Sequence, residues 1–187
     1  MSMLLCVIML VTMGVSALAN TPQNHEDYVI LFSYTRCEEE MQAELEADIT
    51  FYLSRSRTNN PVRVVQSAPR TAFITGRPSG QLPGGERFAN GGGWWFAESG
   101  GPTASVSVSL PAPWNMISVS TNLGQTGRLG RFYFAPDTVN RWHLYNRVEM
   151  RITPWTIYEQ VAPNHWVVFQ RGQTTQRWGR DGFARRA

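Results

Sequence analysis

Apolar and polar residues alternate along most of the chain beyond residue 61. In 103-TASVSVSL-110, Val106, Val108 and Leu110 fall on one side of an extended strand, and the serines between them fall on the other. This pattern predicts a strand with one face in the core and one face in water. Strands are expected at 62–66, 71–75, 103–110, 115–121, 131–135, 141–152, 155–161 and 166–171. Because no helical pattern is interleaved among them, we expect residues 62–187 to form an antiparallel β-sandwich or barrel in a mainly β fold.

The segment 20–61 has a different period, which predicts one amphipathic helix over about residues 36–57. Thr35 and Glu38 have the spacing of a capping box at its start. Residues 28–34 (YVILFSY) are expected to form a short buried strand before it. The helix is acidic, so either its charged face is solvated or it lies on the basic remainder as a detachable segment. Its apolar stripe consists of Met41, Leu45, Ile49, Tyr52 and Leu53.

Residues 1–19 have the pattern of a signal peptide. An apolar run is followed by Ala17-Leu18-Ala19, the small-x-small sequence that signal peptidase cleaves. We therefore expect a secreted protein that is cleaved after Ala19. No Lys or Arg precedes the apolar run, so the alternative is that the segment remains as an anchor.

A loop is predicted between the second and third strands. Residues 76–102 are rich in glycine and proline, which are unfavourable inside a helix. Within this loop, Trp94 and Trp95 are adjacent, so an extended backbone would direct them to opposite faces. Exposed tryptophans can stack on sugars or bases or enter a membrane interface, whereas buried ones form core.

All seventeen basic residues of the chain are arginines. The absence of lysine excludes Walker-type phosphate binding and Schiff-base chemistry. Charge also divides the chain: residues 20–57 sum to −5, and residues 58–187 sum to +8. The larger part is therefore expected to attract an anionic partner.

The segment 141-RWHLYNRVEMRI-152 raises the question of catalysis. In an extended strand its even-numbered residues face the core, while His143, Arg147 and Glu149 project from the other face. A carboxylate, an arginine and a histidine are the groups of a ribonuclease-like site. His143 and Glu149 would be about 20 Å apart along one strand, so a catalytic set would combine Glu149, Arg147 and His165. A solvated face with charges of both signs is the favoured interpretation.

Cysteine and histidine offer little further chemistry. Removal of the signal peptide would leave Cys37 as the single cysteine, so it is either a free thiol or an intermolecular partner. Three histidines without ligand spacing predict no metal site, and no motif predicts a cofactor.

The end of the chain, 176-QRWGRDGFARRA-187, combines arginines with aromatic residues. It is expected to bind an anionic partner or to fray as a charged terminus. The candidate binding residues are Trp94, Trp95, Arg177, Trp178, Arg180, Arg185 and Arg186.

These patterns predict a secreted, non-enzymatic binding protein with a basic surface. Its partner would be a cell-wall or glycan polymer, a membrane surface or a host protein; nucleic acid stays open as a partner, although no motif indicates it. One alternative is a small secreted hydrolase of ribonuclease-like type. Another is a membrane-active toxin that inserts the hairpin of strands 103–110 and 115–121.

Overall fold

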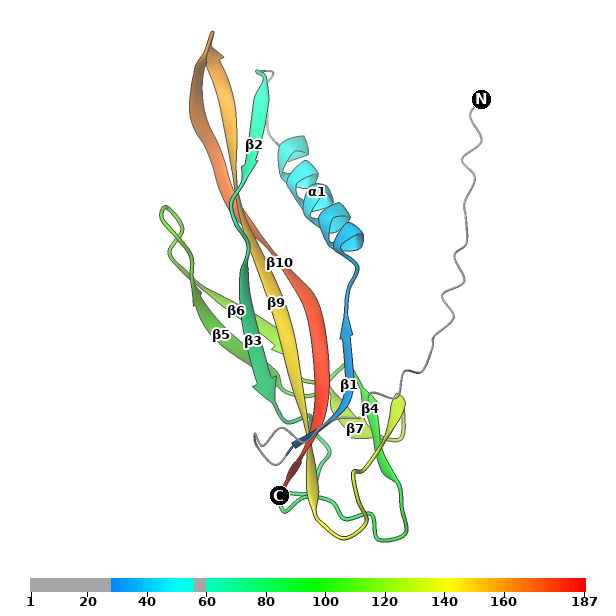
Figure 1. Cartoon of the computed structure of the whole chain (residues 1–187). Coiled ribbons are helices and arrows are strands. Elements are labelled where there is room, and N and C mark those ends of the chain that lie inside the picture. Colours follow the sequence, from blue (N-terminus) through cyan, green and yellow to red (C-terminus); the bar gives the residue numbers. More distant parts are fainter. Residues whose placement is uncertain (1–27, 56–59) are drawn as a thin grey trace, which may run out of the picture.

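The computed structural model describes residues 28–55 and 60–187, and its central feature is a very long hairpin (Figure 1). β9 (Trp142–Ala162) and β10 (His165–Arg186) pair antiparallel over their full length. The connection includes Asn164, which has a φ of 60°. The separate strands predicted at 141–152, 155–161 and 166–171 are therefore parts of two continuous strands. The predicted fold class is confirmed, because the described residues are mainly antiparallel β with a single helix. The predicted signal peptide lies outside the described residues.

A proline in the middle of β9 explains why the sequence suggests a break there. Proline has no N–H group and normally interrupts a central strand. The Pro154 carbonyl accepts a hydrogen bond from Ser67 N–H at 2.8 Å. In an antiparallel strand the nitrogen and the carbonyl of one residue face the same neighbouring strand, so the Pro154 nitrogen also faces the side of β2 and β3. On that side β2 ends at Gln66 and β3 begins at Arg70. The missing donor therefore faces a gap between two partner strands, and β9 continues.

The main sheet is built around the long hairpin. β1 (Tyr28–Thr35) pairs with the C-terminal half of β10, and β2 (Val62–Gln66) and β3 (Arg70–Gly76) pair successively with β9. The strand order is β1-β10-β9-β2, with β3 also on β9. The C-terminal segment is thus a strand with neighbours on both sides and not a frayed end. The prediction that residues 28–34 form a buried strand is wrong in its burial: the residues of β1 are exposed or half-buried.

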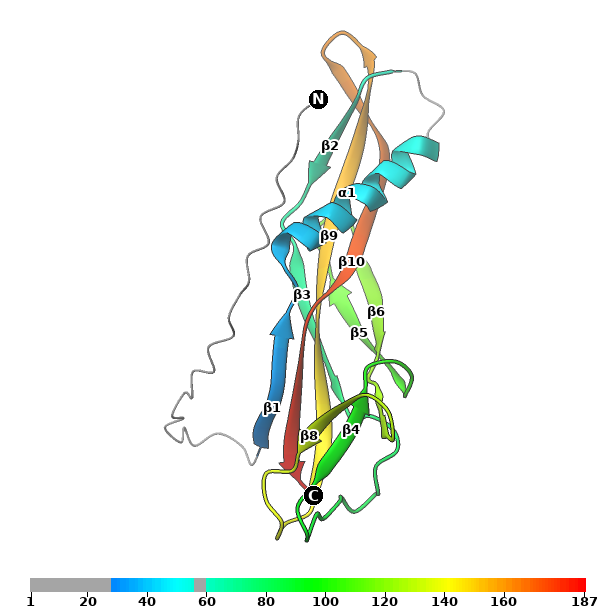
Figure 2. The ribbon, with the colours of Figure 1, turned by 90° about the vertical axis from the view of Figure 1, so that its right-hand side faces the viewer.

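Helix α1 (Glu38–Arg55) crosses the part of the hairpin nearer its turn (Figure 2). The predicted apolar stripe is confirmed: Leu45 and Ile49 form a core cluster with Trp155 and Ile157. The predicted capping box is wrong, because Thr35 is the last residue of β1 and pairs with Gly179. The first helical hydrogen bond instead runs from Met41 N–H to the carbonyl of Cys37.

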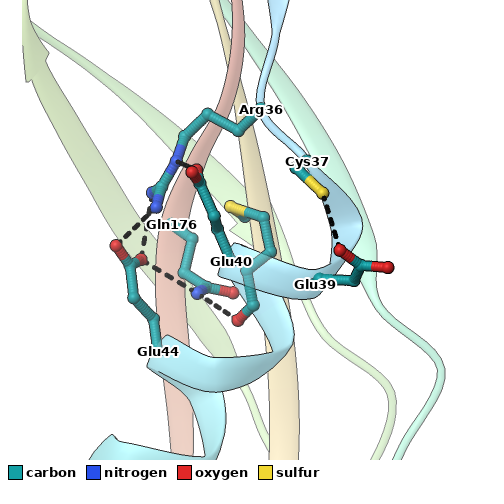
Figure 3. Close-up of polar contacts among 7 residues, drawn as sticks. Arg36, Cys37, Glu39, Glu40, Glu44 and Gln176 are labelled. Carbon is teal, nitrogen blue, oxygen red and sulfur yellow. Dashed lines mark hydrogen bonds and ion pairs between the residues drawn. The ribbon is translucent and has the colours of Figure 1, made fainter. Parts of the chain in front are cut away.

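Polar contacts also tether the start of α1 to β10 (Figure 3). Gln176 donates from Nε2 to the Met41 carbonyl at 2.7 Å and to Glu44 Oε2 at 3.1 Å. Arg36 binds Glu44 through both terminal nitrogens, at 2.6 and 3.0 Å, and lies 3.6 Å from Glu40. The helix is therefore docked by an apolar stripe and by buried hydrogen bonds.

A two-stranded hairpin covers the other face of the long strands. β5 (Thr103–Ser109) pairs with β6 (Met116–Asn122), and the valines of β5 pack against a cluster that includes Val148 and Ile152. Ile152 and Trp155 are an odd number of residues apart in β9, so they point to opposite faces. The hairpin and α1 thus lie on opposite sides of the main sheet.

A third sheet packs near the end where the C-terminus lies (Figure 1). It consists of β7 (Gln125–Gly127), β4 (Gly93–Ala97) and β8 (Arg131–Phe134), in that order. Trp94 and Phe96 are buried against Trp142 and Leu144. Trp95 points outward, as expected for neighbours in a strand.

Candidate functional site

The strand at 141–152 has the two faces that the sequence predicts. Its even-numbered residues are buried, and Arg147 is exposed. His143 is the exception on the polar face, because only 7% of its surface is accessible. Burial and the nearby Arg77 guanidinium lower the pKa of His143, which favours the neutral imidazole.

The structure does not bring Glu149, Arg147 and His165 together. His165 begins β10 at the hairpin turn opposite Ala162, whereas Glu149 lies opposite Gly179. Thirteen residues of β9 separate Glu149 from Ala162, which is roughly 40 Å at about 3.3 Å per residue. Arg147 is bound to Asp181, with Nε 2.9 Å from Oδ2. The three groups therefore cannot act on one phosphodiester together.

The three tryptophans proposed for binding lie in different environments. Trp94 is 2% exposed and belongs to the core, so it cannot contact a ligand at the surface. Trp178 is half-buried beneath the guanidinium of Arg151, which lies 4.9 Å from its ring centroid. Trp95 remains open to solvent on the outer face of β4.

Arg177 and Arg180 face the interior side of β10 because of a β-bulge. The register shifts between Arg177 and Gly179, so Arg177 pairs with Met150 and Arg180 with Val148. Arg180 is 1% exposed, and its Nη2 donates to the Asn122 carbonyl at 3.1 Å. Arg180 is therefore a structural cation and not a surface contact, which corrects the sequence-based expectation.

Glu98 is the counter-ion of both arginines. Its Oε2 lies 3.6 Å from Arg180 Nη1 and 3.7 Å from Arg177 Nη1, and it accepts a hydrogen bond from the Tyr34 hydroxyl at 2.9 Å. Burial lowers the pKa of Arg180 and raises the pKa of Tyr34. A cavity of about 530 Å³ opens beside this network, between Tyr34 and the end of β6 at Asn122.

The positively charged surface lies at the open end of the long hairpin, where β9 begins and β10 ends. We call this surface the basic end. Its arginines come from three segments that are far apart in the sequence. Trp142 pairs with Arg186 and His143 pairs with Arg185, while Ala187 N–H donates to the Arg141 carbonyl. The basic end is formed by Arg77, Arg87, Arg141, Arg185 and Arg186.

Backbone-like contacts hold the loop of residues 77–87 against β9. The Gln81 side chain donates to the Leu144 carbonyl at 2.9 Å and accepts from Leu144 N–H at 2.7 Å, so it takes the place of a neighbouring strand. Glu86 and Trp142 exchange two backbone hydrogen bonds of 2.9 Å. Gly85 has a φ of 76°, and a side chain there would overlap Ala187. This loop can approach the strand only with glycine at position 85.

Three of the arginines donate to loop carbonyls and keep further N–H groups. Arg77 donates to Leu82, Arg87 to Thr138 and Arg141 to Gly85, at 3.1 to 3.3 Å. A guanidinium has five N–H donors, so most of their capacity remains. None of the five arginines has a carboxylate within ion-pair distance in residues 28–55 and 60–187.

Two carboxyl groups lie in the loops of the basic end. Burial raises the pKa of Glu86, which disfavours its charged form. Hydrogen bonds from the Asn140 side chain and backbone lower the pKa of Asp137 to about 2, so this group is ionised at neutral pH. Two carboxyl groups facing five arginines leave a clear excess of positive charge.

A shallow groove of about 280 Å³ adjoins the basic end on the uncovered face of the main sheet. The stacked rings of Tyr145 and Phe183, whose centroids are 5.6 Å apart, line it together with Tyr28. Arg185 also lines the groove and connects it to the basic end. The site therefore combines free guanidinium groups with an aromatic surface.

The part of the chain that the structure describes contains no group of three or more His, Cys, Asp or Glu residues arranged to hold a metal. Within that part, no helix has the length and apolar character needed to cross a membrane. Comparison with protein-family models, curated proteins and solved structures found no match.

Proposed function

We propose that this protein is a secreted, non-enzymatic binding protein whose basic end holds an anionic partner. The observation that carries the proposal is the presence of five arginines on segments at one end of the long hairpin, each without a carboxylate partner among the described residues. Arg185 lines the groove, and Arg186 lies over the Trp142 ring on the other face of the sheet. Neighbouring unpaired cations repel one another, so clustering them is unfavourable unless an anion shares the surface.

The chemistry of arginine narrows the kind of partner. A guanidinium binds carboxylate, sulfate or phosphate through two parallel hydrogen bonds. The five side chains are spread over two loops and a strand end instead of lining a closed pocket, which suits a chain with repeated charges better than one small anion. The groove with Tyr145 and Phe183 offers an adjacent apolar surface. A partner with repeated anionic groups is therefore preferred, and the candidates are a cell-wall or glycan polymer, a membrane surface and a host protein.

Arrangement of the acid and base groups gives no support to hydrolysis. His143 is buried with its Nδ1 unpaired among the described residues, and His165 lies at the distant hairpin turn. General acid–base catalysis requires groups within hydrogen-bond reach of one reacting bond. The ribonuclease-like alternative would need a catalytic set other than Glu149, Arg147 and His165.

The test is binding to heparin, a soluble anionic glycan, across a salt series. We expect affinity to fall steeply with salt, because each occupied anionic group releases counter-ions. A triple variant of the basic end should lose most of the affinity and show a flatter salt dependence. A control variant that has the same net charge as the triple variant should bind heparin as tightly as the native protein does. The triple variant is Arg87→Ser, Arg185→Ser and Arg186→Ser, and the control is Arg55→Ser, Arg70→Ser and Arg171→Ser, at exposed positions outside the basic end.

Two results would count against the proposal. Equal losses in the two variants would show that net charge, and not the basic end, causes binding. RNA cleavage by the native protein that disappears in Glu149→Gln would establish an enzyme instead.

A further inference from the structure

An exposed apolar surface lies on the third sheet, separate from the basic end. It consists of Trp95 on β4, Phe132 and Phe134 on β8, and Leu129 in the turn between β7 and β8, and we call it the apolar turn face. Leu129 is 80% exposed, Phe134 73% and Trp95 46%. Neighbouring rings are in contact, with centroids 5.2 Å apart for Trp95 and Phe132 and 5.0 Å apart for Phe132 and Phe134.

The fold does not account for these side chains. The inner face of the same sheet is buried, because Trp94 and Phe96 pack against the main sheet. The apolar turn face points away from that core, since Trp95 alternates with Trp94 and Phe96 in an extended strand. Contiguous aromatic surface on the outside of a soluble domain commonly marks a contact with another molecule.

Ring geometry argues against a stacking platform for sugars or bases. Such platforms present flat, accessible ring faces to successive units of a ligand. Here Trp95 and Phe132 are tilted by 60°, and Phe132 and Phe134 are nearly perpendicular at 89°. Leu129, the most exposed member, has no ring. The surface is irregular and apolar, and it includes one residue of a turn.

Charge at the turn indicates the occupant. Exposed Arg128 and Arg131 bracket Leu129, and neither has a carboxylate within ion-pair distance in the part of the chain that the structure describes. Leu129 between two arginines, beside an exposed aromatic strand face, fits the boundary of an anionic bilayer, where rings and leucine enter the acyl region and guanidiniums meet headgroup phosphates.

The basic end lies close enough to assist this contact. Ala135, which follows Phe134, donates to the Gly92 carbonyl, and Arg87 donates to Thr138 in the next loop. Arginines of the basic end are therefore connected to the apolar turn face through short loops.

We propose that the apolar turn face inserts into the headgroup region of an anionic phospholipid membrane, with Leu129 and Phe134 entering deepest. This inference rests on the proposed function for its electrostatic attraction, and it identifies the anionic partner as a lipid surface. Insertion adds apolar burial, which salt does not screen.

The experiment measures binding of the native protein to vesicles of phosphatidylcholine alone and of phosphatidylcholine with phosphatidylserine. We expect binding only to the anionic vesicles. The double variant Leu129→Asn and Phe134→Ser should bind these at least about tenfold more weakly, because each removed side chain withdraws one apolar group from the membrane. Met116→Ser is the control, since Met116 is 67% exposed on β6 and lies outside the face.

Fluorescence gives a second, independent readout. Lipids brominated in the acyl chain should quench part of the tryptophan emission, and Trp95→Phe should remove that quenching. Unchanged vesicle binding by the double variant, an equal loss in Met116→Ser, or the absence of quenching would each overturn the inference. Heparin binding that persists without vesicle binding would also overturn it while leaving the proposed function standing. If the native protein shows no salt-dependent binding to heparin or to vesicles, both the inference and the proposed function are refuted. Self-association that only the double variant abolishes would assign the face to a second copy of this chain.

Discussion

Substitution of Leu45 by alanine should show that α1 is an integral part of the fold. Leu45 is 4% exposed and packs in the cluster with Ile49, Trp155 and Ile157. Leucine-to-alanine changes at such sites remove apolar contacts and leave a cavity, with a cost of about 3 kcal/mol. Leucine and alanine have similar helix propensities, so the loss would report packing and not helix formation. For a chain of this size, that cost corresponds to a fall in Tm of about 6–12 °C.

The assay is thermal and urea unfolding followed by circular dichroism, with Glu46→Ala as the matched control. Glu46 lies on the exposed side of the same helix and accepts one hydrogen bond from Gln42, at 2.8 Å. Removing that contact should cost about 0.2–0.5 kcal/mol. A detachable helix would give small and equal shifts for Leu45→Ala and Glu46→Ala, and this result would refute the argument. Hydrogen exchange of the helical amides, fast in a detachable segment and slow in a docked one, provides a second check.

Two further substitutions test particular contacts. Glu86→Gln should raise Tm at pH 7 and leave it unchanged near pH 4, because burial raises the pKa of Glu86 and native stability therefore falls as pH rises through its ionisation. The same substitution should strengthen heparin binding, because it removes a negative charge from the basic end. Weaker heparin binding would contradict this account. Gly182→Ala should lower stability by about 1–3 kcal/mol, because the new methyl group overlaps the Phe32 ring. Gly127→Ala, where space is open, is the control in urea unfolding, and equal midpoints would show that Phe32 yields without cost.

Periodicity in the sequence is sufficient to predict the helices and strands that have one solvent-exposed face and one buried face. The stripe of α1 and the alternation in β5 and β9 each follow from the burial of one side of a regular backbone. The same reasoning predicts that Trp94 and Trp95 point to opposite faces. It cannot predict which of the two is buried, because that depends on where the third sheet docks.

Contacts between distant segments are what the sequence does not reveal. The length of β9 depends on a gap between β2 and β3 that accommodates Pro154, and nothing near Pro154 in the sequence encodes that gap. The burial of Arg180 depends on a bulge at Trp178, since a regular strand would direct Arg177 and Arg180 to opposite faces. The local pattern therefore groups Arg180 with the exposed arginines of the terminus, whereas the structure buries Arg180 and pairs it with Glu98.

The distribution of ion pairs determines which part of the positive charge is available for binding. Acidic residues of α1 neutralise Arg36 and Arg151, Glu98 serves Arg177 and Arg180, and Asp181 binds Arg147. These ion pairs neutralise the arginines in the middle of the molecule. Gly179 lies beside the start of α1. The distance along β10 from Gly179 to Arg185 is about 20 Å at about 3.3 Å per residue. The helix therefore lies away from the end of the hairpin where the C-terminus lies (Figure 2). The opposite charges of the two parts of the chain meet between Glu38 and Arg151, whereas the arginines of the basic end have no carboxylate partner among the described residues.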